Sequence, residues 1–350
     1  MTIEPVRVAV VGVGYWGPNL LRNLIEHEGA EIAWVCDRDP AALARVTRRH
    51  PSLRTTTVLD LVLRDDGVDA IAIATPVLSH GLLAREALQA GKHVLVEKPL
   101  AASAPEAIDL IELARQQDLV LMPGHTFLYS PPVNLVRDYI AAGELGDILF
   151  ISSSRVNLGL HQPDVSVAWD LAPHDLSILR YWLGERPTTV NAIARCCVIP
   201  SVPDIAFVNL GYPSGTIAHV ELSWLAPSKL RRTTVVGSRK MVVYDDTSPE
   251  PVRLFDSGVA VRDPQSFGEY RMTYRTGSII SPRVESVEPL LVEVDDFVRS
   301  VRTGSTPRSD ATLGLDVVLT IEAVERSLAE GGIPTEVERA QKSLLGARSR

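Results

Sequence analysis

The sequence predicts a doubly wound α/β domain with a parallel sheet, followed by an α+β domain with a large, open and mainly antiparallel sheet. Residues 1–123 alternate short apolar runs with amphipathic stretches, which is the pattern of successive βαβ units. After Gly124 the pattern changes to consecutive apolar runs separated by turn signals, which indicates hairpin-linked strands. We therefore expect a first domain over 1–123, a second domain over 124–337 and a polar tail over 338–350.

In the first domain, apolar runs of strand length separate stretches with apolar residues at helical spacing. Asp39 and Ser103 stand at N-cap positions, each with a proline in the following turn, and Gly91 stands where a helix should end. The expected strands are 6–11, 31–36, 69–74, 93–96 and 119–122, and the expected helices are 15–28, one that starts at Asp39, 79–90 and 103–117.

In the second domain, turn signals such as Tyr212-Pro213-Ser214-Gly215 divide a series of strand-like runs. Residues 245–284, rich in Pro, Ser and Asp, have no clear assignment. The expected helices are 132–142, 169–183, 287–303 and 311–330, and the expected strands are 148–156, 188–198, 204–212, 215–224, 231–237 and 240–244.

Composition excludes several classes of protein. The chain has 350 residues, of which 45% are hydrophobic and 22% charged, as in globular proteins. Its net charge of -8 and its short basic runs argue against a nucleic-acid partner. No apolar run approaches the roughly 20 residues that span a membrane, and no signal-peptide layout is present. Three cysteines, Cys36, Cys196 and Cys197, make a poor disulfide framework, and no metal-ligand spacing occurs. We expect a cytoplasmic protein without a metal or membrane partner.

A glycine-rich turn indicates a dinucleotide site. Gly12, Gly14 and Gly17 form a G-x-G-x-x-G between a predicted strand and a predicted helix. In that context the glycines permit a tight turn, close approach of a pyrophosphate and close helix–strand packing. Asp37 ends the second strand, where its carboxylate could accept hydrogen bonds from an adenosine ribose, which favours NAD. The neighbouring Arg38 could instead accept the 2′-phosphate of NADP.

Two further segments carry possible catalytic groups. Lys98, in Glu97-Lys98-Pro99, follows a strand at the sheet edge where α/β proteins bind ligands, but could also be a solvated loop lysine. Asp170 and His174 are four residues apart, so a helix would place them on one face. The imidazole suits proton exchange near neutral pH, while the spacing alone equally allows a capping Asp and a surface His. We expect Pro173 to lie early in that helix.

Taken together, these motifs resemble the Gfo/Idh/MocA oxidoreductases. The resemblance extends from about residue 5 to about residue 335. Its motifs are the glycine-rich turn, Ala74-Thr75-Pro76 with His80, Glu97-Lys98-Pro99 and Asp170-x-x-x-His174. It implies that Lys98, Asp170 and His174 form the catalytic set, and that the open sheet supports assembly into a homotetramer or homodimer.

Within that family, two segments look most like nucleotide-sugar 3-dehydrogenases of the UDP-N-acetylglucosamine type. These segments are Gly14 to Leu20 and Trp169 to Asp175. The chain departs from many family members at Val165 to Trp169, where they carry a glycine-rich stretch, so the wall of the substrate pocket is expected to differ.

The residues expected to contact cofactor or substrate gather in the same motifs. Tyr15, Trp16 and His125 could equally be packing or loop residues, and Arg155 a solvated strand-end residue. The expected cofactor-binding residues are Gly12, Gly14, Tyr15, Trp16, Gly17, Asp37, Arg38, Thr75, Pro76, His80, Glu97, Lys98 and His125. The expected substrate-binding residues are Lys98, Arg155, Asn157, Asp170 and His174.

The predicted reaction is reversible oxidation of a secondary alcohol of a sugar, with hydride transfer to NAD. Either Lys98 or His174 is the formal base, and the sugar, the nucleotide, the oxidised carbon and the direction stay open. The alternatives are an inositol or free-sugar dehydrogenase, an NADPH-dependent deoxysugar ketoreductase and an NAD-dependent glycosidase. A fourth is a catalytically silent redox sensor that binds a protein partner.

Overall fold

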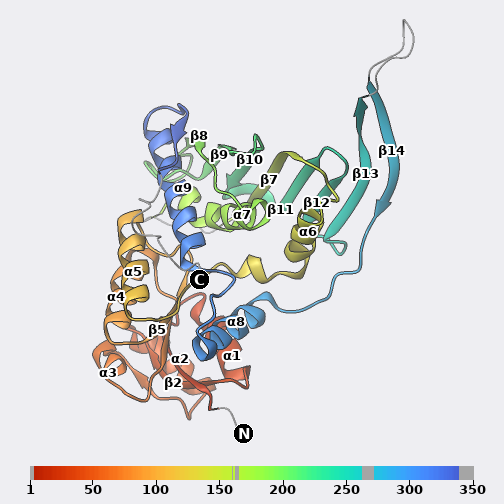
Figure 1. Ribbon diagram of the computed structural model, residues 1–350. Coiled ribbons are helices and arrows are strands. Elements are labelled where there is room, and N and C mark those ends of the chain that lie inside the picture. Colours follow the sequence, from red (N-terminus) through yellow and green to blue (C-terminus); the bar gives the residue numbers. More distant parts are fainter. Residues whose placement is uncertain (1–3, 160, 162–164, 262–271, 339–350) are drawn as a thin grey trace, which may run out of the picture. The chain divides into compact units, whose positions relative to one another are not determined.

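The computed structural model describes residues 4–159, 161, 165–261 and 272–338, and these form two compact units (Figure 1). The first unit contains Met1–Tyr129 and Val287–Leu319, and the second contains Ser130–Ser286 and Thr320–Glu338. The structure thus divides the chain differently from the expected boundary at residue 123. Helix α8 (Pro289–Thr303) returns to the first unit, because its buried face packs against α1 (Gly17–Glu26) and η2 (Thr126–Tyr129).

The first unit holds a parallel sheet of six strands in the order β3-β2-β1-β4-β5-β6. This is the doubly wound order, so the carboxyl ends of its strands lie along one edge. The strands are β1 (Val6–Val11), β2 (Ala30–Cys36), β3 (Thr55–Thr56), β4 (Ala70–Ile73), β5 (His93–Glu97) and β6 (Leu121–Gly124). The remaining helical segments are α2 (Pro40–Arg49), α3 (Leu59–Leu63), η1 (Val77–Ser79), α4 (His80–Gln89) and α5 (Ala104–Gln116).

The helix starts of this unit follow the capping pattern of the sequence. The Asp39 carboxylate accepts a hydrogen bond from the Ala41 amide at 2.9 Å, and the Ser103 hydroxyl accepts one from the Glu106 amide at 3.4 Å. Each side chain satisfies a first-turn amide that has no partner within its helix. The short β3 and α3 lack a distinct periodic pattern and were not expected.

The second unit holds a nine-stranded sheet in the order β14-β13-β12-β11-β7-β10-β9-β8-β15. It is mostly antiparallel, as expected, but β7 pairs with β10 in parallel and thereby separates β10 from β11. Turn signals specify pairs that are adjacent in sequence and carry no information about this long-range insertion. The strands are β7 (Ile148–Leu158), β8 (Thr189–Arg195), β9 (Ile205–Gly211), β10 (Ile217–Ser223), β11 (Leu225–Gly237), β12 (Met241–Asp245), β13 (Val252–Val261), β14 (Met272–Ile280) and β15 (Thr335–Glu336).

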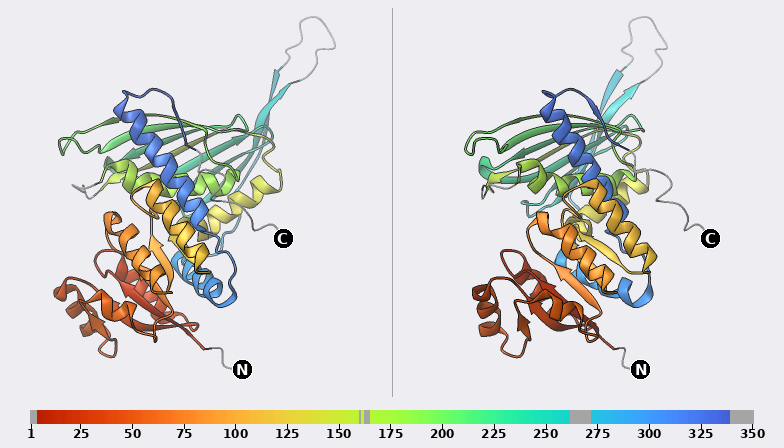
Figure 2. Two further views of the ribbon diagram at one scale, coloured as in Figure 1. Left: turned by 60° about the vertical axis from the view of Figure 1, so that its left-hand side comes forward. Right: turned by 90° about the vertical axis from the view of Figure 1, so that its left-hand side faces the viewer.

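Helices of the second unit cover one face of this sheet (Figure 2). They are α6 (Pro131–Ala141), α7 (Val167–Leu183) and the part of α9 (Ala311–Ala329) from Thr320 onward. Alternate residues of the strands are buried on the helix side, as a two-layer arrangement requires. Large apolar side chains are exposed on several strands, among them Phe150, Ile193, Phe207 and Ile217.

Helix α7 begins earlier than expected. Ser166 caps it, since its hydroxyl accepts a hydrogen bond from the Trp169 amide at 3.4 Å. Pro173 therefore lies inside the helix rather than in its first turn. Because proline has no backbone N–H, one helical hydrogen bond is missing at this position. Ser166 also donates to the Glu325 carboxylate at 2.8 Å, which ties the start of α7 to α9 within this unit.

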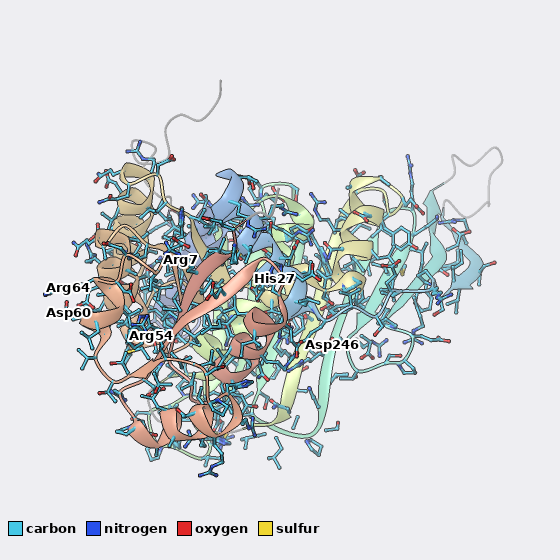
Figure 3. The ribbon with its side chains drawn as sticks, turned by 90° about the horizontal axis from the view of Figure 1, so that it is seen from below. Arg7, His27, Arg54, Asp60, Arg64 and Asp246 are labelled. Carbon is cyan, nitrogen blue, oxygen red and sulfur yellow. The ribbon has the colours of Figure 1, made fainter. Side chains whose placement is uncertain are left out.

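Ion pairs at the surface of the first unit are of the exposed kind, which contribute little to stability. Arg64 pairs with Asp60 at 2.9 Å, and the two side chains extend together from α3 (Figure 3). Among the described residues, no helix is long and apolar enough to cross a membrane. The polar tail expected over 338–350 lies outside the described residues, apart from Glu338.

Candidate active site

The turn between β1 and α1 has the geometry of a dinucleotide-binding turn. Gly12 has a φ of +90°, and a Cβ there would lie 2.7 Å from the Ala74 carbonyl oxygen. A Cβ on Gly17 would lie 2.0 Å from the Gly12 carbonyl oxygen, so only glycine permits this contact. A Cβ on Gly14, in contrast, would meet no atom within 4 Å. Protein atoms thus pack closely against Gly12 and Gly17, whereas the space beside Gly14 is open. This arrangement fits the approach of a pyrophosphate to Gly14.

Asp37 lies at the end of β2, as expected, and links it to the glycine-rich turn. Its carboxylate accepts a hydrogen bond from the Val13 amide at 2.7 Å and another from the Asp39 amide at 2.9 Å. Each oxygen retains a further lone pair that a ribose hydroxyl could use. Arg38 is exposed beside it, so the expected discrimination between NAD and NADP by these two residues stays a prediction.

Tyr15 and Trp16 lie at the start of α1 and differ in their surroundings. Tyr15 is 87% exposed, whereas Trp16 is 36% exposed and hydrogen-bonds the Glu97 carboxyl with its side chain. Because the indole is a donor only, it connects the glycine-rich turn to the end of β5.

His80 holds two of the expected cofactor-binding segments together. It is 1% exposed, and its Nδ1 lies 2.8 Å from the carbonyl oxygen of Pro99, while its Nε2 lies 2.8 Å from that of Thr75. Burial lowers the pKa of His80, although the two carbonyl groups act in the opposite direction. The structure therefore places Thr75-Pro76 beside the segment that carries Lys98, with His80 as the link.

Lys98 follows β5 directly, at the carboxyl edge of the parallel sheet. Its amide donates to the carboxylate of Glu97 at 3.3 Å, and its peptide bond to Pro99 is cis. His125 follows β6, the neighbouring strand, and is 1% exposed. Burial, together with the positive charge of Lys98, lowers the pKa of His125 to about 3, so its ring is neutral at physiological pH.

In the second unit, Asp170 and His174 lie one turn apart on α7, and both are partly exposed. The carboxylate of Asp170 accepts a hydrogen bond from the indole Nε1 of Trp224 at 3.1 Å. Trp224 is almost fully buried between β10 and β11, and the ring of His161 packs edge-on against it at 5.4 Å. The indole thereby fixes the direction of the Asp170 carboxylate.

Arg155 and Asn157 lie near the end of β7 in this unit. The structure buries Arg155 and pairs its Nε with the Asp175 carboxylate of α7 at 2.5 Å. Ser153 donates to the other oxygen of Asp175 at 2.8 Å. Arg155 therefore anchors the helix that carries His174, and its expected contact with substrate stays a prediction. Asn157 is partly exposed, and the Cβ position of Gly159 lies 3.4 Å from its Oδ1.

Sequence reasoning did not single out Trp224 or Glu293, a buried carboxylate of α8. Trp224 has no local signal, because only the folded sheet brings it to Asp170. Glu293 did carry a sequence signal, because it shares the spacing of a single buried helix face with Leu290, Val294 and Phe297. A charged residue on such a face is rare and is often functional. No group of three or more potential metal ligands occurs in the part of the chain that the structure describes.

Comparisons with known proteins agree with this geometry. Residues 6–125 match the model of the oxidoreductase family with an NAD-binding Rossmann fold, and residues 133–243 match the GFO/IDH/MocA C-terminal domain. The chain is 29% identical to UDP-N-acetylglucosamine 3-dehydrogenase of Acidithiobacillus ferrooxidans, over 69% of this chain and 74% of that protein. It is 28% identical to 2,7-anhydro-N-acetylneuraminate hydratase of Escherichia coli, over 62% of this chain but only 61% of the hydratase.

A solved structure resembles the whole chain. The structure of GenD2 from gentamicin A biosynthesis, in complex with NAD, has a TM-score of 0.82 and 25% identity, and the match covers 97% of this chain and 98% of that one. This likeness and the two family models agree with the parallel Rossmann sheet and the mixed nine-stranded sheet described above. The protein belongs to the Gfo/Idh/MocA oxidoreductase family, and its first unit is an NAD-binding Rossmann domain.

Proposed function

We propose that this protein oxidises a secondary alcohol of a nucleotide sugar, at C3 of a sugar of the UDP-N-acetylglucosamine type, with NAD as the hydride acceptor. The observation that carries the proposal is the presence of Lys98 after β5, in the NAD-binding unit, together with the Asp170–His174 face of α7. Similarity to a UDP-N-acetylglucosamine 3-dehydrogenase supports the choice of substrate class.

The proposed roles follow from the chemistry of each side chain. NAD, when bound, accepts the hydride from the carbinol carbon. Lys98 hydrogen-bonds the reacting hydroxyl oxygen and stabilises the negative charge that develops on it. His174 exchanges the hydroxyl proton, as an imidazole can near neutral pH, and either it or Lys98 is the formal base. Asp170, held by Trp224, orients the sugar or the imidazole.

A second function has support from one relative. The similarity to a hydratase, a class of enzyme that needs no net oxidant, favours transient oxidation with regeneration of NAD in the same cycle. Such a reaction would use the same Lys98, Asp170 and His174 but would leave no reduced cofactor behind.

The substrate class is tested by the absorbance of reduced nicotinamide after the protein is mixed with NAD and UDP-N-acetylglucosamine. We expect a rise with the UDP-sugar and none with free inositols assayed in parallel. A rise with inositols alone would replace the nucleotide-sugar assignment by polyol oxidation. Turnover of a sugar substrate with no net reduced cofactor, detected by mass spectrometry, would favour the transient-oxidation alternative.

The cofactor turn is tested by Gly14→Ala. The added methyl group meets no protein atom, so folding should be unaffected, while it occupies the open side of the turn. We expect the Kd for NAD to rise at least about tenfold, measured by isothermal titration calorimetry. Gly17→Ala is the contrasting variant, because its clash with Gly12 should lower both stability and affinity. Unchanged affinity in Gly14→Ala would contradict the placement of the pyrophosphate.

The catalytic assignment is tested by Lys98→Ala and His174→Ala. Each should lower kcat by about 10²–10⁴-fold, the usual loss for a positioned acid or base, while NAD binding through the glycine-rich turn persists. Wild-type turnover in both variants would rule out this set of catalytic residues.

The role of the indole is tested by Trp224→Phe, which removes the hydrogen bond to Asp170. A hydrogen bond to a charged acceptor contributes about 1.5–3 kcal/mol, so kcat/KM should fall about 10- to 100-fold. Trp182→Phe is the matched control, since that buried indole donates to the Val133 carbonyl oxygen at 2.9 Å. Equal losses in the two variants would mean that Trp224 acts through packing alone.

A further inference from the structure

Three elements of the NAD-binding unit bring two acidic residues together. Glu97 is the last residue of β5 and pairs with Gly124 of β6. Its carboxyl group lies over that glycine, since a Cβ on Gly124 would be 3.3 Å from Glu97 Oε1. Two residues further on, the Thr126 hydroxyl donates to Glu293 Oε2 of α8 at 2.8 Å. We call Glu97, His125, Thr126 and Glu293 the acid cluster.

Polar atoms in this cluster are buried without partners. Glu293 is 1% exposed, and its Oε1 has no hydrogen-bond partner among the described residues. Neither ring nitrogen of His125 has a hydrogen-bond partner among these residues. Asp296, one turn further along α8, differs, because it accepts hydrogen bonds from the Tyr129 hydroxyl and the Arg308 amide, each at 2.7 Å.

A buried carboxyl group binds a proton more tightly than an exposed one. Burial raises the pKa of Glu97 to about 7, although the charge of Lys98 and the hydrogen bonds from the Lys98 amide and the Trp16 side chain act in the opposite direction. Burial raises the pKa of Glu293 well above its usual range, and the charge of Glu97 adds to the effect. His125 stays neutral, for the reasons given above. The two carboxyl groups therefore keep a proton to a higher pH than separate, exposed carboxyl groups would.

The charged and titratable groups around the cluster come from every neighbouring element. Lys98 follows β5, and Trp16 approaches Glu97 from the start of α1. Arg22 of α1 bonds Glu288 at the N-terminal end of α8, and Asp295 of α8 pairs with His27. The charge of Asp296 also raises the pKa of Glu293, and Asp296 itself accepts hydrogen bonds from the Tyr129 hydroxyl, the Arg299 guanidinium and the Arg308 amide.

We propose that Glu97 and Glu293 hold one proton between them and release it when NAD⁺, whose nicotinamide ring is cationic, binds to this unit. The proton returns when the cofactor is reduced and its ring is neutral. If the proposed function holds, the hydride goes to the cofactor, the alcohol loses its proton to the formal base, and the pair takes up one proton in the same cycle, so that charge and atoms balance. The proposed proton release depends only on NAD binding, and not on the identity of the sugar.

The experiment is calorimetric titration of the whole protein with NAD⁺ and with NADH at pH 8, in buffers of different ionisation enthalpy. This pH lies above the pKa of Glu97, which is about 7, so release that disappears in Glu293→Gln is assigned to Glu293. We expect release of about one proton for each NAD⁺ bound and none for NADH. The affinity for NAD⁺ should therefore rise by about tenfold per pH unit around this pH, while that for NADH stays level.

Glu293→Gln should abolish the release, because its side chain is neutral and carries no exchangeable acid proton. Asp295→Asn is the matched control on the same helix, and it should release as the wild type does, since the Asp295 side chain is exposed and pairs with His27 at 3.2 Å. If Glu293→Gln does not fold, Thr126→Val provides the test. That variant removes a hydrogen bond that lowers the pKa of Glu293, so release should move to a higher pH.

Absence of proton release in the wild type, or equal release in Glu293→Gln, would overturn the proposal whether or not a UDP-sugar is turned over. The same proton also affects stability. Because both carboxyl groups have a raised pKa in the folded protein, they favour folding most below their unfolded pKa of about 4.5, and this contribution is lost as the pH rises through the folded pKa, which is about 7 for Glu97. The melting temperature of Glu293→Gln should thus rise relative to the wild type from pH 5 to pH 8.

Discussion

The contact between Gly17 and the Gly12 carbonyl group is the constraint on which the NAD-binding unit depends. It allows α1 to start directly above the end of β1, and no residue with a Cβ could occupy position 17 at this distance. Around it, Asp37 binds the turn to β2, and Trp16 binds it to Glu97. His80 then connects the segments after β4 and β5 through two carbonyl groups. The cofactor turn and Lys98 are thereby held as parts of one edge.

The second unit positions its functional side chains by a different means. Helix α7 is attached to the sheet by the buried pair of Arg155 and Asp175, and to α9 by the bond from Ser166 to Glu325. Removal of one partner of a buried ion pair typically costs about 3–5 kcal/mol, because the other charge is left buried without compensation. Trp224 adds the last restraint by fixing the carboxylate of Asp170. The helix can thus present Asp170 and His174 in a defined direction.

Much of this was predictable from the sequence, because local chemistry determines it. The glycine spacing, the cap at Asp39 and the apolar runs of the parallel strands each specify an element without reference to distant residues. What could not be predicted depends on long-range packing. The insertion of β7 between β10 and β11 and the return of α8 to the first unit are examples. For the same reason the sequence did not reveal that Arg155 pairs with Asp175, which lies on another element.

The central claim is that a hydride leaves C3 of a nucleotide sugar for NAD. The most direct measurement uses UDP-N-acetylglucosamine that carries deuterium at C3, with NAD in excess, and determines the mass of the reduced cofactor. The account predicts that the reduced cofactor is one mass unit heavier than the product from unlabelled substrate, with a slower rate if hydride transfer limits turnover. Reduced cofactor of ordinary mass from the labelled sugar would contradict oxidation at C3.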